Sequence, residues 1–192
     1  TAIGRASLLL NTSDNNTAVG RNSLNQNTSG TRNTAVGVSA LDANTTGFDN
    51  VAVGHQALDL NTTGEANIAI GVDALGENVV GSYLTAIGSS ALQYSGLHGG
   101  AAVSSFTVGI GYTAGRYQTG SYNTFVGDHA GTGAATTAPY GTGGRLTALG
   151  SYALSQHTSG DGNTAVGYSA SGNARSGSDN VAIGDRALNN SR

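Results

Sequence analysis

Histidines and carboxylates are the side chains in this 192-residue sequence best suited to metal binding or acid–base chemistry, since cysteine is absent. The four histidines occupy no common place in the chain, and no two of them show ligand spacing such as His-x3-His, so we expect no metal site. They are His55, His98, His129 and His157. The eleven carboxylates lie mostly in turn-like segments, where Asp can cap its own backbone, and turn roles explain them without a bound cation.

Enzymatic chemistry is not expected either. The carboxylates show no consistent pairing of the kind that hydrolyses glycosidic bonds. The glycine-rich stretch GIGYTAG at 109–115 has no helix signal after it, so it does not predict a phosphate site. We therefore expect a non-enzymatic protein with no metal and no cofactor.

Charge excludes two classes of partner. Only 10% of the residues are charged, the formal net charge is −3, and all eight basic residues are arginine, with no run of like charge. This pattern predicts no nucleic-acid partner and no grip on an anionic membrane. No apolar run approaches the ~20 residues of a membrane span, so we expect no direct membrane insertion of this segment.

A repeat organises the whole chain. The motif NTAVG at 33–37 returns as NVAVG at 50, NIAIG at 67 and LTAIG at 84. With the Asn of NTAVG as position 1, units begin at 16, 33, 50, 67, 84, 107, 123, 146, 163 and 180, after a partial first unit. Most units have the same length as the unit that begins at 33, and their consensus is N-T-A-V-G-x-x-A-L-x-x-N-T-T-G-x-x. Such a period indicates a repeat architecture.

The repeat predicts an all-β fold, a parallel β-roll or β-solenoid of about eleven short coils forming one domain over 1–192. Each unit should contain a strand at positions 1–5, a turn at the invariant glycine of position 5, a second short strand near positions 8–11 and a turn at NTTG. Recurrent Asn at position 1 predicts a ladder of amides along the axis. At ~4.8 Å a coil, the rod should be roughly 50 Å long. Because the sequence starts and ends inside a unit, we expect a segment of a longer fibre.

Strand alternation assigns the side chains to two faces. Positions 2 and 4 carry Thr, Val, Ile or Leu on one face, and positions 3 and 5 carry Ala and Gly on the other. Alanine stands at position 3 in nine of the eleven units, the exceptions being Gly109 and Phe125. We expect this flat Ala/Gly stripe to contact neighbouring chains, because thin repeats bury too little area alone. The alternative is that small residues fit a narrow single-chain roll.

The motifs NTAVGVSAL, NVAVGHQAL, NIAIGVDAL and NVAIGDRAL resemble the YadA-like head repeats of trimeric autotransporter adhesins, over essentially the whole chain. Similar repeats occur in phage tail fibres and related chimeric fibre proteins. The resemblance implies a side-by-side homotrimer of left-handed β-rolls, with the Val or Ile of AVG inside each roll. The unit here is longer than the usual head repeat by its NTTG segment, and no neck motif, heptad stalk or membrane barrel is present.

Two insertions mark a candidate receptor-binding site. The units 84–106 and 123–145 are longer than the others, and their extra residues fall at 93–105 and 132–144, after the same positions of the unit. Insertions grouped on one face of a solenoid often form its binding face. Tyr94, His98 and Tyr140 lie within them and offer flat rings suited to sugars or protein. The alternative is that these residues pack the insertions onto the roll or onto the adjacent chain.

These observations predict an extracellular fibre or adhesin segment, at a cell surface or on a virion, that presents or extends a surface for a cell-surface glycan or protein receptor. One alternative is a pure spacer whose binding tip lies elsewhere. Another is an ice- or matrix-binding solenoid, suggested by the threonines. Val51 and Ile68 interrupt the threonine file at position 2, which breaks the regular array that such a surface needs.

Overall fold

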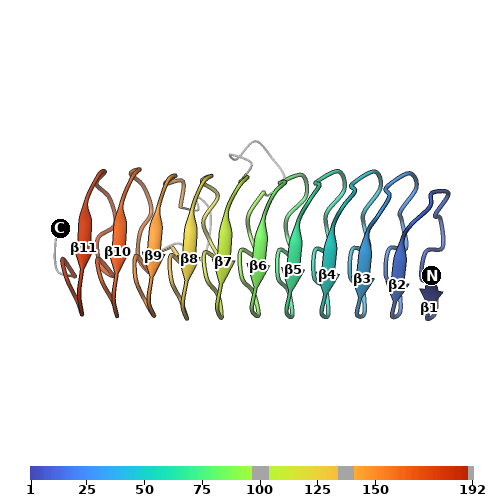
Figure 1. The fold of residues 1–192 in the computed structure, drawn as a ribbon, viewed down its shortest axis with the longest axis horizontal. Coiled ribbons are helices and arrows are strands. Elements are labelled where there is room, and N and C mark those ends of the chain that lie inside the picture. Colours follow the sequence, from blue (N-terminus) through green and yellow to red (C-terminus); the bar gives the residue numbers. More distant parts are fainter. Residues whose placement is uncertain (97–103, 134–140, 190–192) are drawn as a thin grey trace.

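The structure, a computed structural model, describes residues 1–96, 104–133 and 141–189. In these residues the chain is an all-β parallel solenoid without helix, as the repeat predicts, and its coils stack into a rod (Figure 1). Each strand pairs in parallel with the next one in sequence, so the sheet order is simply β1 to β11. The strands are β1 (Ala2–Ile3), β2 (Thr17–Val19), β3 (Thr34–Val36), β4 (Val51–Val53), β5 (Ile68–Ile70), β6 (Thr85–Ile87), β7 (Val108–Ile110), β8 (Thr124–Val126), β9 (Thr147–Leu149), β10 (Thr164–Val166) and β11 (Val181–Ile183).

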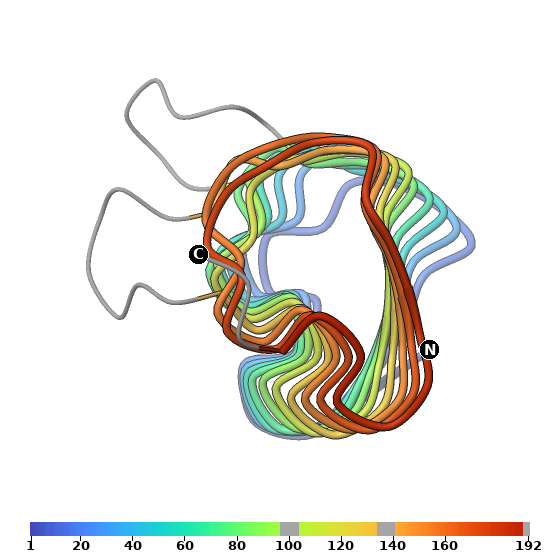
Figure 2. The same cartoon turned by 90° about the vertical axis from the view of Figure 1, so that its left-hand side faces the viewer.

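Register keeps equivalent positions of the unit in line along the rod. Thr34, Ala35 and Val36 of β3 pair with Val51, Ala52 and Val53 of β4, and the other pairs repeat this match. The longer unit between β6 and β7 does not shift it, since Thr85 still pairs with Val108. Seen along the axis, the coils lie one behind another with a small progressive rotation (Figure 2). Residues at the same position of successive units therefore lie in one row along the rod.

The prediction of a second strand at positions 8–11 of the unit is wrong. Within the described residues this part of each unit is a turn, apart from one isolated parallel bridge between Gln118 and Gly141. The physical reason is the backbone, because position 9 has positive φ where it is leucine, as at Leu24 with φ 49°. A positive φ cannot occur in an extended strand. The turns are still bonded coil to coil, for example from Leu24 N–H to Ala40 O at 3.0 Å.

The two faces of the strand are the reverse of those expected. Alanine at position 3 faces inward and is fully buried, whereas the aliphatic residue at position 4 faces outward. The Ala stripe is thus part of the core and not a contact between chains, and the implied place of Val and Ile inside the roll is also wrong. The reason is that leucine at position 9 already fills the narrow interior: a Cβ on Gly109 would lie 2.7 Å from Cγ of Leu92. The core consists mainly of Ala18, Leu24, Ala35, Ala40, Leu41, Ala52, Ala57, Leu58, Ala69, Ala74, Leu75, Ala86, Ala91 and Leu92, with their counterparts further along.

Glycine at position 5 is required by the close stacking of coils. At Gly37 φ is 141°, and a Cβ there would lie 2.3 Å from the carbonyl oxygen of Gly54 in the next coil. Both the backbone conformation and the space therefore exclude a side chain. This confirms the turn expected at the invariant glycine.

In one coil a different side chain fills the interior. Phe125 replaces alanine at position 3 of β8 and is fully buried. Its ring occupies space that leucine takes elsewhere, because position 9 is glycine both in its own unit and in the preceding one. A Cβ on Gly131 would lie 2.2 Å from Cδ1 of Phe125, and one on Gly115 would lie 2.5 Å from Cδ2. One large ring thus stands in for two leucines.

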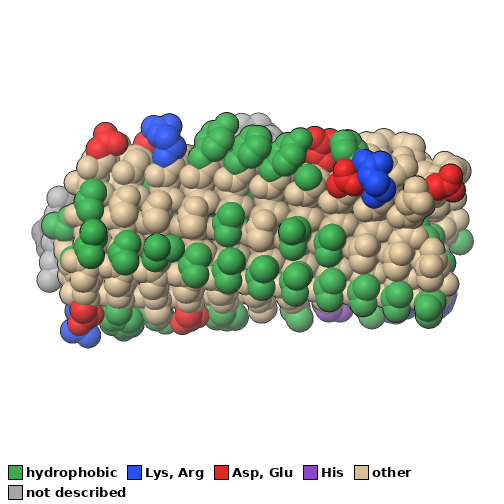
Figure 3. Space-filling model, in the orientation of Figure 1, with side chains coloured by type: hydrophobic (Ala, Val, Ile, Leu, Met, Phe, Trp, Pro, Cys, Tyr) green, Lys and Arg blue, Asp and Glu red, His purple; other side chains and the backbone are tan. Residues whose placement is uncertain are grey.

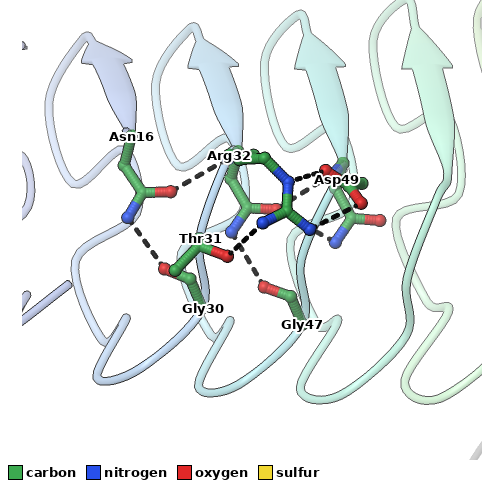
Figure 4. Close-up of polar contacts among 8 residues, drawn as sticks. Asn16, Gly30, Thr31, Arg32, Gly47 and Asp49 are labelled. Carbon is green, nitrogen blue, oxygen red and sulfur yellow. Dashed lines mark hydrogen bonds and ion pairs between the residues drawn. The ribbon is translucent and has the colours of Figure 1, made fainter. Parts of the chain in front are cut away.

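Buried asparagines hold the coils together. At position 1, Asn33 N–H donates to Oδ1 of Asn16 at 2.9 Å, and the Asn16 amide donates to its own closing turn at Gly30 O (2.8 Å; Figure 4). These side chains bond mainly to backbone. The ladder of amide to amide lies instead at position 12, which the sequence analysis did not single out. There each Nδ2 donates to Oδ1 of the preceding coil, through Asn27, Asn44, Asn61 and Asn78.

Candidate functional site

The strand face of the rod carries a row of exposed apolar side chains. Position 4 supplies one outward aliphatic side chain per coil, and position 2 adds Val or Ile in several coils. Figure 3 shows this file of hydrophobic side chains running along the whole strand face. Ile70, Ile87 and Ile110 are each exposed by 37–39% in the single chain. Contiguous apolar surface of this kind is typical of a contact with another protein.

Of the three predicted receptor-binding residues, the structure describes Tyr94, while His98 and Tyr140 lie outside the described residues. Tyr94 stacks on Tyr117 of the next coil, with ring centroids 5.3 Å apart and an interplanar angle of 16°. Arg116 lies over both rings, its Cζ 5.7 Å and 5.1 Å from their centroids. Tyr94 is therefore part of a cluster at the start of the first insertion.

The described flanks of the two insertions lie close together. Ser95, in the first insertion, donates from its hydroxyl to Gln118 O at 3.3 Å. Gln118 in turn forms the parallel bridge with Gly141, at the end of the second insertion. The described ends of both insertions thus meet around Gln118, on one side of the rod.

An exposed aromatic ridge, which the sequence analysis did not identify, consists of Tyr83, Phe106 and Tyr122. Their rings stack with centroids 4.9 Å and 5.3 Å apart and interplanar angles of 1° and 3°. Each ring stands at the last position of its unit and is exposed by 47%, 51% and 62% in turn. Because the rings stack along the axis, their edges form a continuous outer surface three coils long.

Charged groups continue the same side of the rod beyond both ends of the aromatic ridge (Figure 3). Toward the N-terminus, Arg32 pairs with Asp49 (Figure 4), and the hydrogen bond from the guanidinium lowers the pKa of Asp49. Toward the C-terminus, Arg145 Nη2 lies 2.9 Å from Oδ2 of Asp161. The pKa of Asp161 is also lowered, chiefly by the backbone N–H of Gly144.

The ridge has one polar contact of its own at its N-terminal end. The Tyr83 hydroxyl donates to Oε1 of Glu65 at 2.8 Å, and this hydrogen bond raises the pKa of the phenol. The ridge therefore combines apolar ring edges with an oriented carboxylate. Such a mixture suits hydroxyl-rich or mixed apolar and polar partners.

A second aromatic row follows the position-5 glycines of β7 to β10. Tyr112 meets the ring of His129 edge-on at 5.3 Å, and His129 stacks on Tyr152 at 4.8 Å. Tyr168 then meets Tyr152 edge-on at 6.2 Å, and its other neighbour is the guanidinium of Arg186 at 5.8 Å. His129 is thus placed by ring contacts, beside Asp128.

Within the residues described, no group of three or more His, Asp or Glu side chains is arranged to hold a metal ion. No helix in that part of the chain is long and apolar enough to cross a membrane.

The signal that would have revealed the aromatic ridge is the repeat register. Tyr83, Phe106 and Tyr122 each directly precede position 1 of a unit, so the grid alone puts them in one row. Counting tyrosines along the chain hides this, because Phe106 belongs to the row while Tyr112 and Tyr117 do not. Arg116 was missed because a single arginine carries no motif.

The surfaces of this rod are therefore known from its own geometry alone: no protein-family model, no curated protein and no solved structure matches the chain.

Proposed function

We propose that this chain is a non-enzymatic segment of a trimeric extracellular fibre or adhesin, at a cell surface or on a virion, whose rod presents a receptor-binding surface. The observation that carries the proposal is the uninterrupted apolar file along the strand face. A rod with an apolar row along its strand face is best covered by a partner that runs its full length, and a parallel copy of the same chain has the matching length and register.

The sequence of the strands supports this reading. Thr, Val or Ile at position 2 and Val, Ile or Leu at position 4 are residues that fit a flat, buried strand surface. Each coil contributes the outward side chains of positions 2 and 4. Because the strands are so short, these side chains form a narrow face that several copies can share about one axis. The number three comes from the resemblance to YadA-like heads, and the strand face, rather than the Ala stripe, is the surface that would meet the neighbours.

The aromatic ridge supports a receptor-binding role. Exposed Tyr and Phe are enriched at recognition surfaces, because they supply large contact area with few rotatable bonds. The ridge occurs on the coils of β5 to β7, next to the insertions in the coils of β6 and β8. A cell-surface glycan or protein is the receptor class that we propose.

Solution mass tests the assembly. The single chain has a mass of 19.0 kDa, and light scattering coupled to gel filtration should find three times this value. Ile70→Asp should shift the mass toward that of the single chain, because it places a charge in each of the proposed contacts. Val72→Asp is the matched control, since Val72 is an exposed aliphatic residue of the same coil outside the strand face. A folded wild-type monomer would contradict the trimer.

A pure spacer is the second candidate, favoured by the regular coils of β2 to β5, which carry two interior rows of asparagine. Alanine at all three positions of the aromatic ridge separates the two functions. Loss of attachment to target cells, with the mass unchanged, supports the binding role, whereas full attachment supports the spacer.

A further inference from the structure

We propose that Arg116, with Gln93, Tyr94 and Tyr117, forms a binding site for the carboxylate of an acidic sugar. The inference rests on the proposed receptor-binding function and names the ligand class. The four residues lie on the adjacent coils of β6 and β7, where the first insertion begins.

The orientation of the arginine is fixed by three groups. Nε of Arg116 donates to Oε1 of Gln93 at 2.8 Å, and Cζ lies 5.7 Å and 5.1 Å from the centroids of Tyr94 and Tyr117. The two rings are themselves 5.3 Å apart, so the guanidinium and the rings form a nearly equilateral triangle. An arginine held in this way loses little further freedom when it binds a ligand.

The backbone holds the same cluster. Tyr94 N–H donates to Arg116 O at 3.1 Å, and Arg116 N–H donates to Thr113 O at 3.2 Å. Tyr117 N–H donates to Thr132 O at 2.9 Å, which ties the cluster to the start of the second insertion. The site is thus anchored on the rigid coils.

The terminal nitrogens of Arg116 are the groups that can take a ligand. Among the described residues, neither Nη1 nor Nη2 has a hydrogen bond, and no carboxylate forms an ion pair with this side chain, in contrast to Arg32 and Arg145. The side chain is half-buried, so its charge is partly shielded from water. A planar guanidinium with two free donors matches a carboxylate, which accepts both bonds at once.

The surroundings select a ligand with one negative charge. Arg116 is the only Arg or Lys between Arg32 and Arg145, and the chain carries a net charge of −3. A polyanion such as a nucleic acid or a highly sulfated chain would find no second cation and would be repelled overall. A sugar acid instead places one carboxylate on Arg116 and the apolar face and hydroxyls of its ring against the tyrosines and Gln93.

The test is direct binding by titration calorimetry or saturation-transfer NMR to the wild-type chain. The probes are 3′-sialyllactose and the monosaccharide galacturonate, each with a single carboxylate, with lactose as the neutral control, and the two acids separate sialate from uronate recognition. We expect binding of at least one acid and at least tenfold weaker binding of lactose. Equal binding of lactose, or no binding of either acid, would overturn the proposal.

Variants locate the site. Arg116→Gln should weaken binding at least tenfold, and Arg116→Lys severalfold or more, because lysine keeps the charge but loses the bidentate fork and the Nε bond to Gln93. Arg145→Gln is the matched control, with the same change in net charge at a paired arginine, and it should leave binding within twofold. Equal weakening by Arg116→Gln and Arg145→Gln would show a general charge effect and contradict the site.

Folding and assembly are read separately. Each variant is compared with wild type by circular dichroism and by solution mass before binding is measured. A wild-type chain that binds the acid as a monomer would contradict the trimer while upholding the site. A trimer that binds no acid would do the reverse.

Discussion

Residues 16–88 and residues 107–167 are built from the same repeat but differ in what fills the interior and what lies outside. In the first region, every coil has leucine at position 9 and buried asparagine at position 12 up to Asn78, and the outside carries few rings. In the second, position 12 holds Gln118 and His157, position 9 holds two glycines, and aromatic rows cover the outside.

The difference teaches that strand register and interior chemistry are separate requirements. Both regions keep the same parallel pairing, because position 3 stays inside and position 5 stays glycine. In the second region the apolar interior departs from the consensus through a matched exchange of Phe125 for leucine at Gly115 and Gly131. The outer surface of this region can therefore carry aromatic rings and insertions while the parallel pairing of the strands stays the same.

The interior exchange around Phe125 gives the largest expected effect. Phe125→Ala should lower the free energy of unfolding by about 3–5 kcal/mol, because it empties the space between Gly115 and Gly131. Adding Gly115→Leu and Gly131→Leu should recover part of this loss, since the triple variant restores alanine at position 3 of β8 and leucine at position 9 of both units, while Leu92, whose Cδ2 would lie 2.6 Å from a Cβ on residue 115, has to shift. Urea unfolding followed by circular dichroism at one protein concentration measures both values.

The backbone allows this rescue. Gly115 and Gly131 have φ of 63° and 58°, close to the 49–53° of Leu24 and Leu41 at the same position of their units. Leucine at 115 and 131 with Phe125 retained should instead destabilise the chain, because the new side chains would occupy the ring's space. A triple variant no more stable than Phe125→Ala would show that the two regions do not share one interior plan.

The next largest change in the free energy of unfolding is expected from substitution of the buried polar side chains. Asn44 has both ends of its amide bonded, with Nδ2 on Asn27 Oδ1 at 2.7 Å and Oδ1 accepting from Asn61 at 2.9 Å. Gln118 donates from Nε2 to His157 O at 2.8 Å, but its buried Oε1 has no hydrogen-bond partner among the residues that the structure describes. Asn44→Leu should therefore cost about 1–3 kcal/mol, because it leaves buried amide groups unpaired.

Gln118→Met, of similar shape, is the comparison. It should cost about 1 kcal/mol, less than Asn44→Leu, because it removes an unpaired buried oxygen and leaves only His157 O without its donor. The same urea series measures both variants. Equal costs for Asn44→Leu and Gln118→Met would mean that the ladder of the first region contributes no more than the irregular polar interior of the second.

Much of this architecture could be read from the repeat. The period predicted the all-β parallel solenoid and the invariant glycine predicted the turn, whereas the amide ladder predicted at position 1 lies at position 12. The faces could not be assigned by alternation alone, because alternation separates Ala from Val but does not say which set faces the interior. Leucine at position 9 decides that question, since it leaves room only for a methyl group opposite.

The candidate site was less accessible from sequence, for a different reason. Tyr94 was identified because it lies in an insertion, but its partners Arg116 and Tyr117 belong to the next unit of the repeat. Residues that touch on neighbouring coils are separated in the sequence by the length of one unit, and that length changes at each insertion. Counted from the start of each unit, however, Tyr94 and Tyr117 both stand at position 11 and Arg116 at position 10 beside them, so aligning the units, rather than following the insertion alone, would have placed them together.

The smallest effect concerns two carboxylates, one in each region, whose pKa values move in opposite directions. Burial raises the pKa of Asp59, against a hydrogen bond from Gln56, and the nearby Asp42 and Glu77 raise it further. The folded state therefore favours the protonated form of Asp59. Its stabilising contribution is complete below the ordinary carboxyl pKa and is lost as the pH rises through the higher, folded value. Asp161 has a lowered pKa, so its contribution is present above the ordinary value and is lost as the pH falls through the lower one.

Two isosteric variants use these opposite signs. Asp59→Asn should make the chain more stable at pH 7, by less than about 1 kcal/mol, because it removes a half-buried charge beside two like charges. Asp161→Asn should make the chain less stable at pH 7, because the amide is a weaker partner for the Gly144 N–H and for Arg145. Both differences from wild type should shrink as the pH falls toward 3, where the carboxylates become protonated, and urea midpoints at pH 7, 5 and 3 measure them. Shifts of the same sign for both variants at pH 7 would mean that Asp42 and Glu77 do not repel Asp59, and the contrast between the two regions would then lie in packing alone.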